Sequence, residues 1–285
     1  MDTKQAFKWV VFWICLALCF NLGIYIAFGE QKALEFLGGY VIEQILSLDN
    51  LFLFILVFKN FGISTRNQRR VLNYGIMGAI VLRLIFVILG VTVVSKFHWI
   101  LYIFGITLIM SGFKMLFKQE EENHDFRNNG LVKLLRKIIP VTDNLVGEKF
   151  FVKINNVLHA TPLFVILVIV EGTDILFAID SIPAIFSITT DAFIVYTSNI
   201  FAILGLRSLY FLLVKVNDTF KYVEYGVALI LVFTGIKLSI LMFHIEIDIA
   251  FSIIVIAIIL LTSILVSVIA KIIKGKKYTT HDYKV

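Results

Sequence analysis

The chain carries acidic side chains inside two long apolar segments, where carboxylates are rare. One segment, VIEQILSLDNLFLF, contains Glu43 and Asp49, and the other, VEGTDILFAIDSIPAIF, contains Glu171, Asp174 and Asp180. A charged side chain at the centre of a bilayer costs about 2.5–3.5 kcal/mol on insertion scales. The five acids therefore need a bound cation, a proton or a counter-charge, and they are the first candidates for chemistry.

Helical spacing places other oxygen-bearing side chains beside these acids. Glu43, Ser47 and Asn50 follow one another at intervals of four and three residues, so they share one face of a helix. Asp174 and Ser181 repeat the spacing of Glu43 and Asn50. The donors are carboxylate, amide and hydroxyl oxygens, which suit hard divalent ions such as Mn²⁺, Mg²⁺ or Ca²⁺. The residues predicted to bind the ion are Glu43, Asp49, Asn50, Asp174, Asp180 and Ser181.

A proline adds a backbone feature to the second segment. Pro183 follows Asp180 by three residues and cannot donate a hydrogen bond to the carbonyl of Ile179. We expect a broken or bent helix just beyond Asp180. Such a break would turn Asp180 inward and free a carbonyl oxygen as a further cation ligand.

Charge balance offers a purely structural explanation of the acids, which would then only neutralise Arg83 and Arg207 within the apolar segments. Five acids against two arginines leave three carboxylates unmatched. This excess of negative charge is what a cation site, or a set of protonatable groups, requires. We expect Arg83 and Arg207 to balance the charge of the empty site. Glu171 has no counterpart in the first segment, and we expect it to lie behind the ligands or to handle protons.

Intramembrane proteolysis is a further alternative, because two aspartates on neighbouring helices can share a proton and activate water. Asp49 and Asp180 are formally placed for it, but such a pair leaves Asn50 and the other acids without a role, and the chain has no Gly-x-Gly-Asp segment. The only cysteines, Cys15 and Cys19, lie one helical turn apart and are interpreted as packing residues. We predict that the protein is not an enzyme and holds no cofactor.

The elements that must position these groups are membrane-spanning helices. Of the 285 residues, 59% are hydrophobic and 16% are charged, whereas soluble domains have about 25% charged residues. Apolar stretches of about 20 residues recur, which is the length that crosses a hydrocarbon core about 30 Å thick. The predicted fold class is all-α, a polytopic transmembrane bundle of about eight spans: 9–28, 36–58, 74–95, 97–117, 162–188, 193–214, 222–243 and 248–270.

The basic residues are divided unequally between the two sides of this bundle. One side, with both chain ends, holds 20 of the 26 Lys and Arg residues, and the other holds only Lys32 and Lys96. Cytoplasmic loops carry such an excess of basic residues. We therefore expect both termini in the cytoplasm. The net charge of +6 reports orientation in the lipid bilayer, and no nucleic-acid partner is expected.

The two acidic segments belong to a longer repeat. Glu43 matches Asp174, Arg83 matches Arg207, and Gly112-Phe113-Lys114 matches Gly235-Ile236-Lys237, at offsets of 131, 124 and 123 residues. Each unit has three helices, so the second copy enters the membrane from the opposite side, an inverted repeat of the kind common in transporters. The predicted organisation is one membrane domain over residues 1–285, made up of a first three-helix repeat (36–117), a cytoplasmic linker (118–161), a second repeat (162–243) and a C-terminal span (248–270).

The linker has two parts of opposite charge. It begins with the acidic run Glu120-Glu121-Glu122 and continues with the basic amphipathic stretch LVKLLRKIIP. We interpret it as a solvated connection with an interfacial helix against anionic lipid. A metal-sensing or partner-binding role of the acidic run is the alternative.

At these residues the chain resembles the TerC family of integral membrane proteins, a family named for tellurium resistance that includes bacterial manganese exporters. The resemblance rests on GGYVIEQILSLDNLFLF, VLNYGIMGAIVLRLIF, ATPLFVILVIVEGTDILFAIDSIPAIFSIT and FIVYTSNIFAILGLRSLYFLL, and it covers about residues 30–240. Two departures stand out. Gly172 replaces a frequent threonine, and Asn21 replaces a frequent aspartate of the first span.

What the resemblance implies is metal-ion transport, mostly Mn²⁺ efflux, across the bacterial cytoplasmic membrane. It assigns the intramembrane acids to Glu43, Asp49, Asp174 and Asp180, with Asn50, Ser181 and Asn199 as polar companions. The resulting hypothesis is a divalent-cation transporter that works by alternating access. The alternative is a membrane scaffold that does not transport, but supports metal delivery to exported proteins, or their folding, at the protein export machinery.

Overall fold

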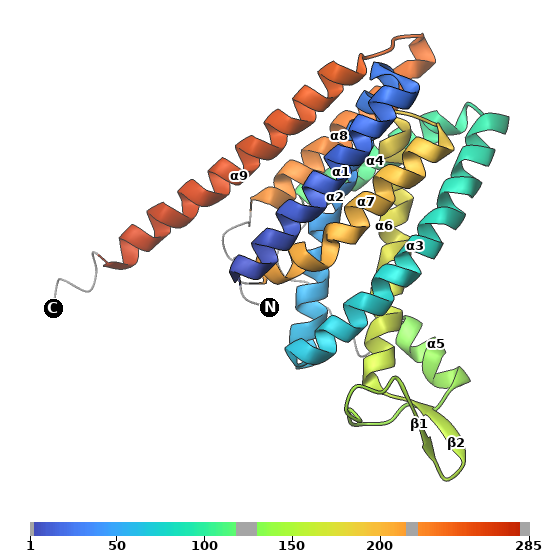
Figure 1. Cartoon of the computed structure of the whole chain (residues 1–285), viewed down its shortest axis with the longest axis vertical. Coiled ribbons are helices and arrows are strands. Elements are labelled where there is room, and N and C mark those ends of the chain that lie inside the picture. The colour runs from blue at the N-terminus through green and yellow to red at the C-terminus, as the bar shows by residue number, and fades with distance from the viewer. Residues whose placement is uncertain (1–2, 118–129, 215–221, 280–285) are drawn as a thin grey trace.

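The computed structural model describes residues 3–117, 130–214 and 222–279 (Figure 1), with the side chains of Thr3, Asp49, Leu131 and 272–279 excepted. These residues form a helical bundle with one small β-hairpin. The helices are α1 (Thr3–Phe28), α2 (Glu30–Asn60), α3 (Thr65–Lys96), α4 (Ile100–Leu116), α5 (Gly130–Ile138), α6 (Pro162–Phe186), α7 (Ala192–Leu213), α8 (Val223–Ile240), a 3₁₀ turn (Leu241–Phe243) and α9 (Ile249–Thr279). The hairpin pairs β1 (Phe151–Ile154) with β2 (Val157–Ala160) antiparallel.

The prediction of a transmembrane helical bundle is confirmed. Each of the eight predicted spans is a helix, and seven of the described helices are long and apolar enough to cross a membrane. The remaining one, α4, has 17 residues and is the shorter apolar helix of the set. In a bilayer every backbone polar group must be satisfied within the protein, and continuous helices achieve this.

The helices run alternately up and down the bundle. The start of α1, the end of α9 and the region of α5 with the hairpin all lie toward the lower end in Figure 1, as an even number of spans requires. The loop charges predict that this end is cytoplasmic, and that orientation stays a prediction. The opposite end carries the α1–α2, α3–α4 and α6–α7 connections.

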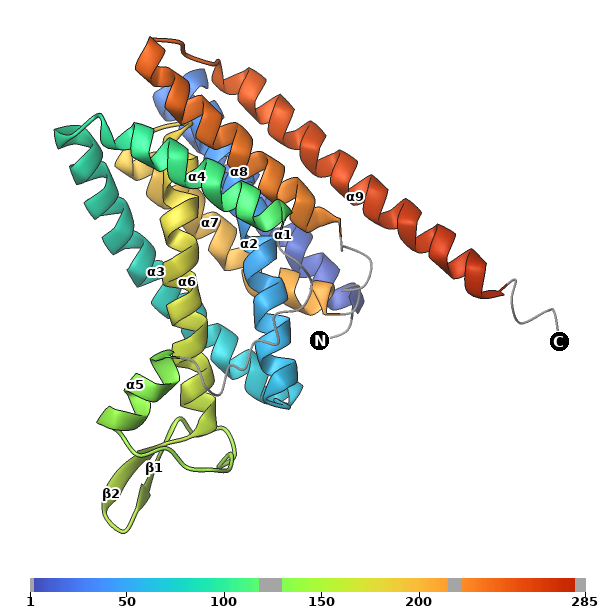
Figure 2. The same cartoon turned by 180° about the vertical axis from the view of Figure 1, so that it is seen from behind.

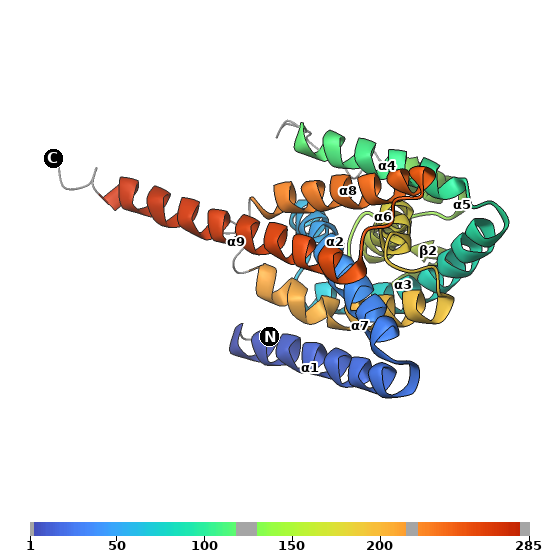
Figure 3. The same cartoon turned by 90° about the horizontal axis from the view of Figure 1, so that it is seen from above.

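The core of the bundle is formed by α2, α6, α7 and α8, and α1 and α9 lie outside it. Of the most apolar stretch of 18 residues in each helix, only 11% is buried in α1 and in α9, against 59% in α2 and 50% in α7. Viewed from above, α1 lies along one side of the bundle, and the C-terminal part of α9 projects away from it (Figure 3). Their exposed Leu, Ile and Phe side chains therefore face the hydrocarbon of the membrane, and the buried acids of α2 and α6 lie inside.

Glycines allow α4 and α8 to pack along each other in close backbone contact (Figures 2 and 3). A Cβ on Gly235 would lie 2.6 Å from the carbonyl oxygen of Gly105, and one on Gly112 would lie 2.7 Å from that of Ala228. Small residues at such crossings let transmembrane backbones approach. At the offset of 123 residues, Gly112 corresponds to Gly235 and Gly105 corresponds to Ala228. The two close contacts are therefore equivalent under the predicted repeat.

Other helix pairs agree with this exchange. In the bundle α2 packs against α7, and α3 packs against α6. In the predicted repeat α2 corresponds to α6 and α3 to α7, so these two helix pairs are equivalent. Both pairs join the first three-helix segment to the second. This packing supports the predicted inverted repeat, which stays a prediction together with the division of the chain into units.

The expected break in α6 is absent. α6 is helical from Pro162 to Phe186 and runs through Pro183, which lies in its last turn. A proline there removes only one backbone hydrogen bond shortly before the helix ends. The backbone N–H of Ser187 donates to the carbonyls of Pro183 and Ala184. Asp180 is therefore oriented by a continuous helix. The expected break was wrong, and a bend of α6 stays a prediction.

The described part of the linker is anchored to the bundle by charge and aromatic contacts. Glu148 forms ion pairs with Arg66 and Arg70 at the start of α3. The guanidinium of Arg70 also stacks over Tyr74 and Phe150, 5.7 and 5.2 Å from the ring centroids. The predicted amphipathic helix is α5, whereas the acidic run at 120–122 lies outside the described residues.

The contact between α4 and α8 gives a test of the fold. Replacing Gly235 by Ala should lower the free energy of unfolding by about 1–3 kcal/mol, the usual cost of overpacking, because the new methyl group meets the Gly105 backbone. The measurement is thermal unfolding of the purified protein in detergent. Gly23→Ala on α1 is the matched control, since a Cβ there meets no atom within 4 Å. Equal stability of the two variants would contradict the described packing.

Candidate cation site

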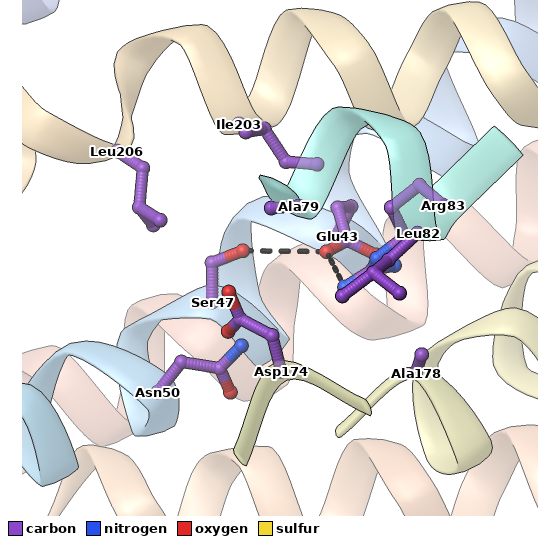
Figure 4. A pocket seen from close by; sticks show the side chains of 10 residues that line it. All are labelled: Glu43, Ser47, Asn50, Ala79, Leu82, Arg83, Asp174, Ala178, Ile203 and Leu206. Atoms are coloured by element: carbon purple, nitrogen blue, oxygen red, sulfur yellow. Dashed lines mark hydrogen bonds and ion pairs between the residues drawn. The ribbon is translucent and has the colours of Figure 1, made fainter. Parts of the chain in front are cut away.

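The buried acids of α2 and α6 meet around a small cavity in the centre of the bundle (Figure 4). Its volume is about 10 Å³, about that of one water-sized sphere. Four helices line it, and the lining residues are Glu43, Ser47, Asn50, Ala79, Leu82, Arg83, Asp174, Ala178, Ile203 and Leu206. The helical spacing of Glu43, Ser47 and Asn50 explains why α2 presents all three to the same space.

Arg83 of α3 and Glu43 of α2 form a buried ion pair beside this cavity. The two guanidinium nitrogens lie 2.7 Å from the two carboxylate oxygens, so the contact is bidentate. The side chains are only 5% and 1% exposed. Two parallel charge-assisted hydrogen bonds of this kind are among the strongest polar contacts in proteins.

The same guanidinium also connects the second half of the chain. Nη1 of Arg83 donates to Ser181 Oγ on α6 at 2.7 Å and to Asn199 Oδ1 on α7 at 2.5 Å. Asn199 in turn donates from its amide nitrogen to the carbonyl of Val195, which fixes the orientation of the amide. Arg83 therefore holds α2, α3, α6 and α7 together at one point.

Asp174 faces the cavity without a counter-charge of its own. Its carboxylate is turned toward Ser47 and Asn50 (Figure 4). Within the described part of the chain no hydrogen bond or ion pair reaches it, although the residue is only 9% exposed. Two carboxylates against one guanidinium, Glu43 and Asp174 against Arg83, leave a formal charge of −2 + 1 = −1 when both acids are ionised.

Asn50 also lines the cavity, with its amide nitrogen turned toward Asp174 and its amide oxygen turned away (Figure 4). Its amide oxygen is buried and finds no hydrogen-bond partner among the described residues, and the residue as a whole is 4% exposed. A buried acceptor left without a partner costs about 1–3 kcal/mol. Ser47 is nearby, with its hydroxyl 3.4 Å from Glu43 Oε1. The cavity is thus lined by two carboxylates, a hydroxyl and an amide whose oxygen is unused.

Two other predicted residues of α6 lie apart from this cavity. Asp180 accepts a hydrogen bond of 3.0 Å from the hydroxyl of Ser111 on α4. Glu171 packs against α3 at Gly78, where any Cβ would clash with its carboxylate, and its Oε2 is buried without a partner in the described chain. Neither side chain lines the cavity that Glu43 and Asp174 share.

The second arginine is also separate from the acids. Arg207 donates to the amide oxygen of Asn73 at 2.6 Å, on a partly exposed part of α7. The side chain of Asp49 lies outside the described residues. Among the described side chains, no group of three or more His, Cys, Asp or Glu could hold a metal ion. The structure therefore brings together Glu43, Asn50 and Asp174 of the predicted ligands.

One buried acid was missed by the sequence reasoning. Glu35, at the start of α2, is 5% exposed. It stands eight residues before Glu43 and so lies on the same face of the helix. That spacing could have identified it, but the predicted span begins at residue 36 and so leaves Glu35 out. Ser47 was recognised as part of the polar stripe, yet it was not counted among the ligands.

Comparison with known proteins agrees with the membrane fold. A family model described as "Integral membrane protein TerC family" matches residues 28–277. An Escherichia coli K12 protein is 47% identical over 252 residues, which cover 86% of this chain and 78% of the relative. It is named "Putative membrane-bound redox modulator Alx", as is a Photorhabdus laumondii protein that is 46% identical over the same shares of both chains.

A relative from Rickettsia bellii is 43% identical over 271 residues, or 95% of this chain and 89% of its own length, and is named "Uncharacterized membrane protein". No solved structure matches the chain. The relatives are membrane proteins by name, and the family match covers the residues of the cavity.

The ion pair predicts a specific pattern of stability changes. Arg83→Met should lower the free energy of unfolding by about 3–5 kcal/mol, because it leaves the Glu43 charge buried without a partner. Adding Glu43→Gln should recover part of that loss. The measurement is thermal unfolding of Arg83→Met, Glu43→Gln and the double variant in detergent.

Arg207→Met is the matched control for this cycle. Arg207 bonds only a neutral amide among the described residues and is partly exposed, so the loss should be smaller. Strictly additive effects of the Arg83 and Glu43 substitutions would show that the pair is not coupled in solution.

Proposed function

The chain belongs to the TerC family of integral membrane proteins, and on that premise we propose that it is a membrane transporter of divalent metal cations which exports Mn²⁺ from the cytoplasm. The observation that carries the proposal is the pairing of Asp174 with Asn50 at the cavity. In the described chain no hydrogen bond or ion pair reaches the Asp174 carboxylate, and the buried amide oxygen of Asn50 has no partner. A half-turn of the amide about its Cβ–Cγ bond would direct that oxygen into the cavity. A cation would satisfy both.

The donor chemistry favours a hard divalent ion. Glu43 and Asp174 supply carboxylate oxygens, Asn50 an amide oxygen and Ser47 a hydroxyl oxygen. Oxygen-only donors suit Mn²⁺, Mg²⁺ and Ca²⁺, whereas soft ions prefer thiolates. The cavity has room for about one water-sized sphere, so an ion with its full hydration shell does not fit. Selection of Mn²⁺ within this class rests on the family resemblance.

Arg83 has a defined role in this proposal. When no ion is bound, its guanidinium neutralises Glu43 and keeps the carboxylate from repelling Asp174. An ion that enters beside Asp174 competes with Arg83 for Glu43, and the guanidinium keeps its bonds to Ser181 and Asn199. Arg83 thus acts as a counter-charge that the ion partly replaces.

The location of the site fits alternating access. The cavity is lined by α2 and α3 from one half of the chain and by α6 and α7 from the other. A rocking of the two halves changes the distances between the ligands and so weakens or strengthens ion binding. Asp49 and Asp180, which the family resemblance includes among the ligands, retain that role as part of the proposal.

The alternative is a scaffold that supports metal delivery to exported proteins, or their folding, without carrying ions. Mn²⁺ content separates the two functions. Cells that express Asp174→Asn should accumulate Mn²⁺ as cells without the protein do, and the purified variant should bind Mn²⁺ about tenfold or more weakly, since loss of one full charge at contact exceeds about 1.4 kcal/mol.

Asp143→Asn is the matched control, because Asp143 is exposed in the linker, far from the cavity lining. It should retain export and binding. The proposal is wrong if cells with Asp174→Asn lower their Mn²⁺ content as effectively as cells with the unaltered protein.

The name of two relatives suggests redox modulation as a second candidate function. The thiols that could carry it are Cys15 and Cys19, which are free and exposed on α1, outside the acid-lined cavity. We predict that the double substitution Cys15→Ser and Cys19→Ser leaves Mn²⁺ export unchanged. The measurement is Mn²⁺ efflux from cells that express the variant, and loss of efflux would assign the thiols a part in transport.

A further inference from the structure

A second polar cluster joins the start of α2 to the connection between α6 and α7, and the cation site does not use it. Lys32 Nζ lies 2.8 Å from Glu35 Oε2 and 2.9 Å from Asp191 Oδ2. Thr189 donates from its hydroxyl to the same Glu35 oxygen at 2.6 Å, and the backbone N–H of Asp191 donates to Thr189 Oγ1. We name Lys32, Glu35, Thr189 and Asp191 the terminal clamp.

The clamp has a buried half and an exposed half. Glu35 and Thr189 are 5% and 8% exposed, whereas the side chains of Lys32 and Asp191 are about a third exposed (33% and 35%). Asp191 also caps α7, accepting hydrogen bonds from the backbone N–H groups of Phe193 and Ile194. The partly exposed ion pair of Lys32 and Asp191 is a weak contact that breaks at low cost. The buried hydrogen bond between Thr189 and Glu35 lies on the interior side of it.

The position of the clamp relates it to the cation site. Glu35 stands eight residues before Glu43 on the same face of α2, so the two lie about 12 Å apart along the helix at 1.5 Å per residue. Gly39 lies between them, where a Cβ would come within 2.7 Å of Ser198 Oγ on α7. The face of α2 that leads from the cavity to the clamp is therefore closed by tight packing against α7.

The terminal clamp is held closed in part by the opposite charges of Lys32 and Asp191. Burial alone would raise the pKa of Asp191, but the hydrogen bonds from Lys32 and from the backbone N–H groups of Ile194 and Phe193 hold it below its usual value. The carboxylate is therefore ionised at neutral pH, opposite the ammonium of Lys32. The contacts that cross between helices are Lys32–Asp191 and Thr189–Glu35, while Lys32–Glu35 lies within α2.

We propose that the terminal clamp is the gate of the transport path at the end of the bundle opposite α5 and the hairpin, and that the structure shows it closed. The inference rests on the proposed transport function. By the loop charges this end faces outward, so opening of the gate releases the exported ion. Opening breaks the two cross-helix contacts and separates α2 from the α6–α7 connection. Glu35 then offers a carboxylate on the path of the leaving cation.

Reversible cross-linking across the clamp tests this gate. Lys32→Cys and Asp191→Cys are combined in a chain with Cys15→Ser and Cys19→Ser, and a short bifunctional methanethiosulfonate reagent bridges the two new thiols. In reconstituted vesicles the reagent should reduce Mn²⁺ transport to the rate of protein-free vesicles, and a reductant should restore the rate measured before treatment. Each variant is compared with itself before and after the reagent.

The controls separate a gate from damage. Either single-cysteine variant should keep its own transport rate after the reagent, because one thiol cannot bridge the clamp. The cross-linked protein should still bind Mn²⁺ in detergent with the affinity of the reduced protein, because in this proposal the ion enters the cation site from the other end.

Four outcomes would overturn the gate. They are failure of the two thiols to be bridged, transport that continues in fully bridged protein, a loss that the reductant does not reverse, and a parallel loss of Mn²⁺ binding. Absence of transport by the unaltered protein would instead refute the proposed function itself, and the gate would fall with it. The two failures are therefore distinguishable in one experiment.

Discussion

The rest of the structure depends on one buried ion pair, Arg83 with Glu43. Removing two charges from water is expensive, and only good geometry with further hydrogen bonds offsets that cost. Here the geometry is bidentate, and Ser181 and Asn199 take up further hydrogen bonds of the guanidinium. Because each partner comes from a different helix, the electrostatic requirement fixes the relative positions of α2, α3, α6 and α7. The cavity next to the pair exists because these four helices are held at that spacing.

The remaining acids have different surroundings, although the two acidic segments look alike in sequence. Asp174 faces the cavity and has no ion-pair partner in the described chain, so it supplies the unbalanced negative charge. Asp180 bonds Ser111 on another helix, and Glu171 lies against Gly78. Arg83 enters the cluster, whereas its sequence counterpart Arg207 bonds Asn73. Two segments that look alike in sequence therefore contribute unequally to one asymmetric site.

The packing divides the bundle into a part that resists separation and a part that can open. The backbones of α4 and α8 are in close contact at their glycines. Even a small displacement of one helix along the other would disrupt this packing. At the terminal clamp, by contrast, a partly exposed Lys32–Asp191 pair and one hydroxyl hydrogen bond connect α2 to the α6–α7 connection. A transporter that works by alternating access needs both kinds of contact, tight helix packing that stays intact and weak contacts that break when the path opens.

The sequence by itself determined the helical membrane class, the eight apolar helices and the face of α2 that carries Glu43, Ser47 and Asn50. These follow from apolar length and helical period, which are local properties. Tertiary structure alone decided that Arg83 and not Arg207 meets the acids and that Asp180 faces α4. These outcomes depend on the rotation of each helix about its axis and on its neighbours. Residues distant in the chain set both, so no local pattern specifies them.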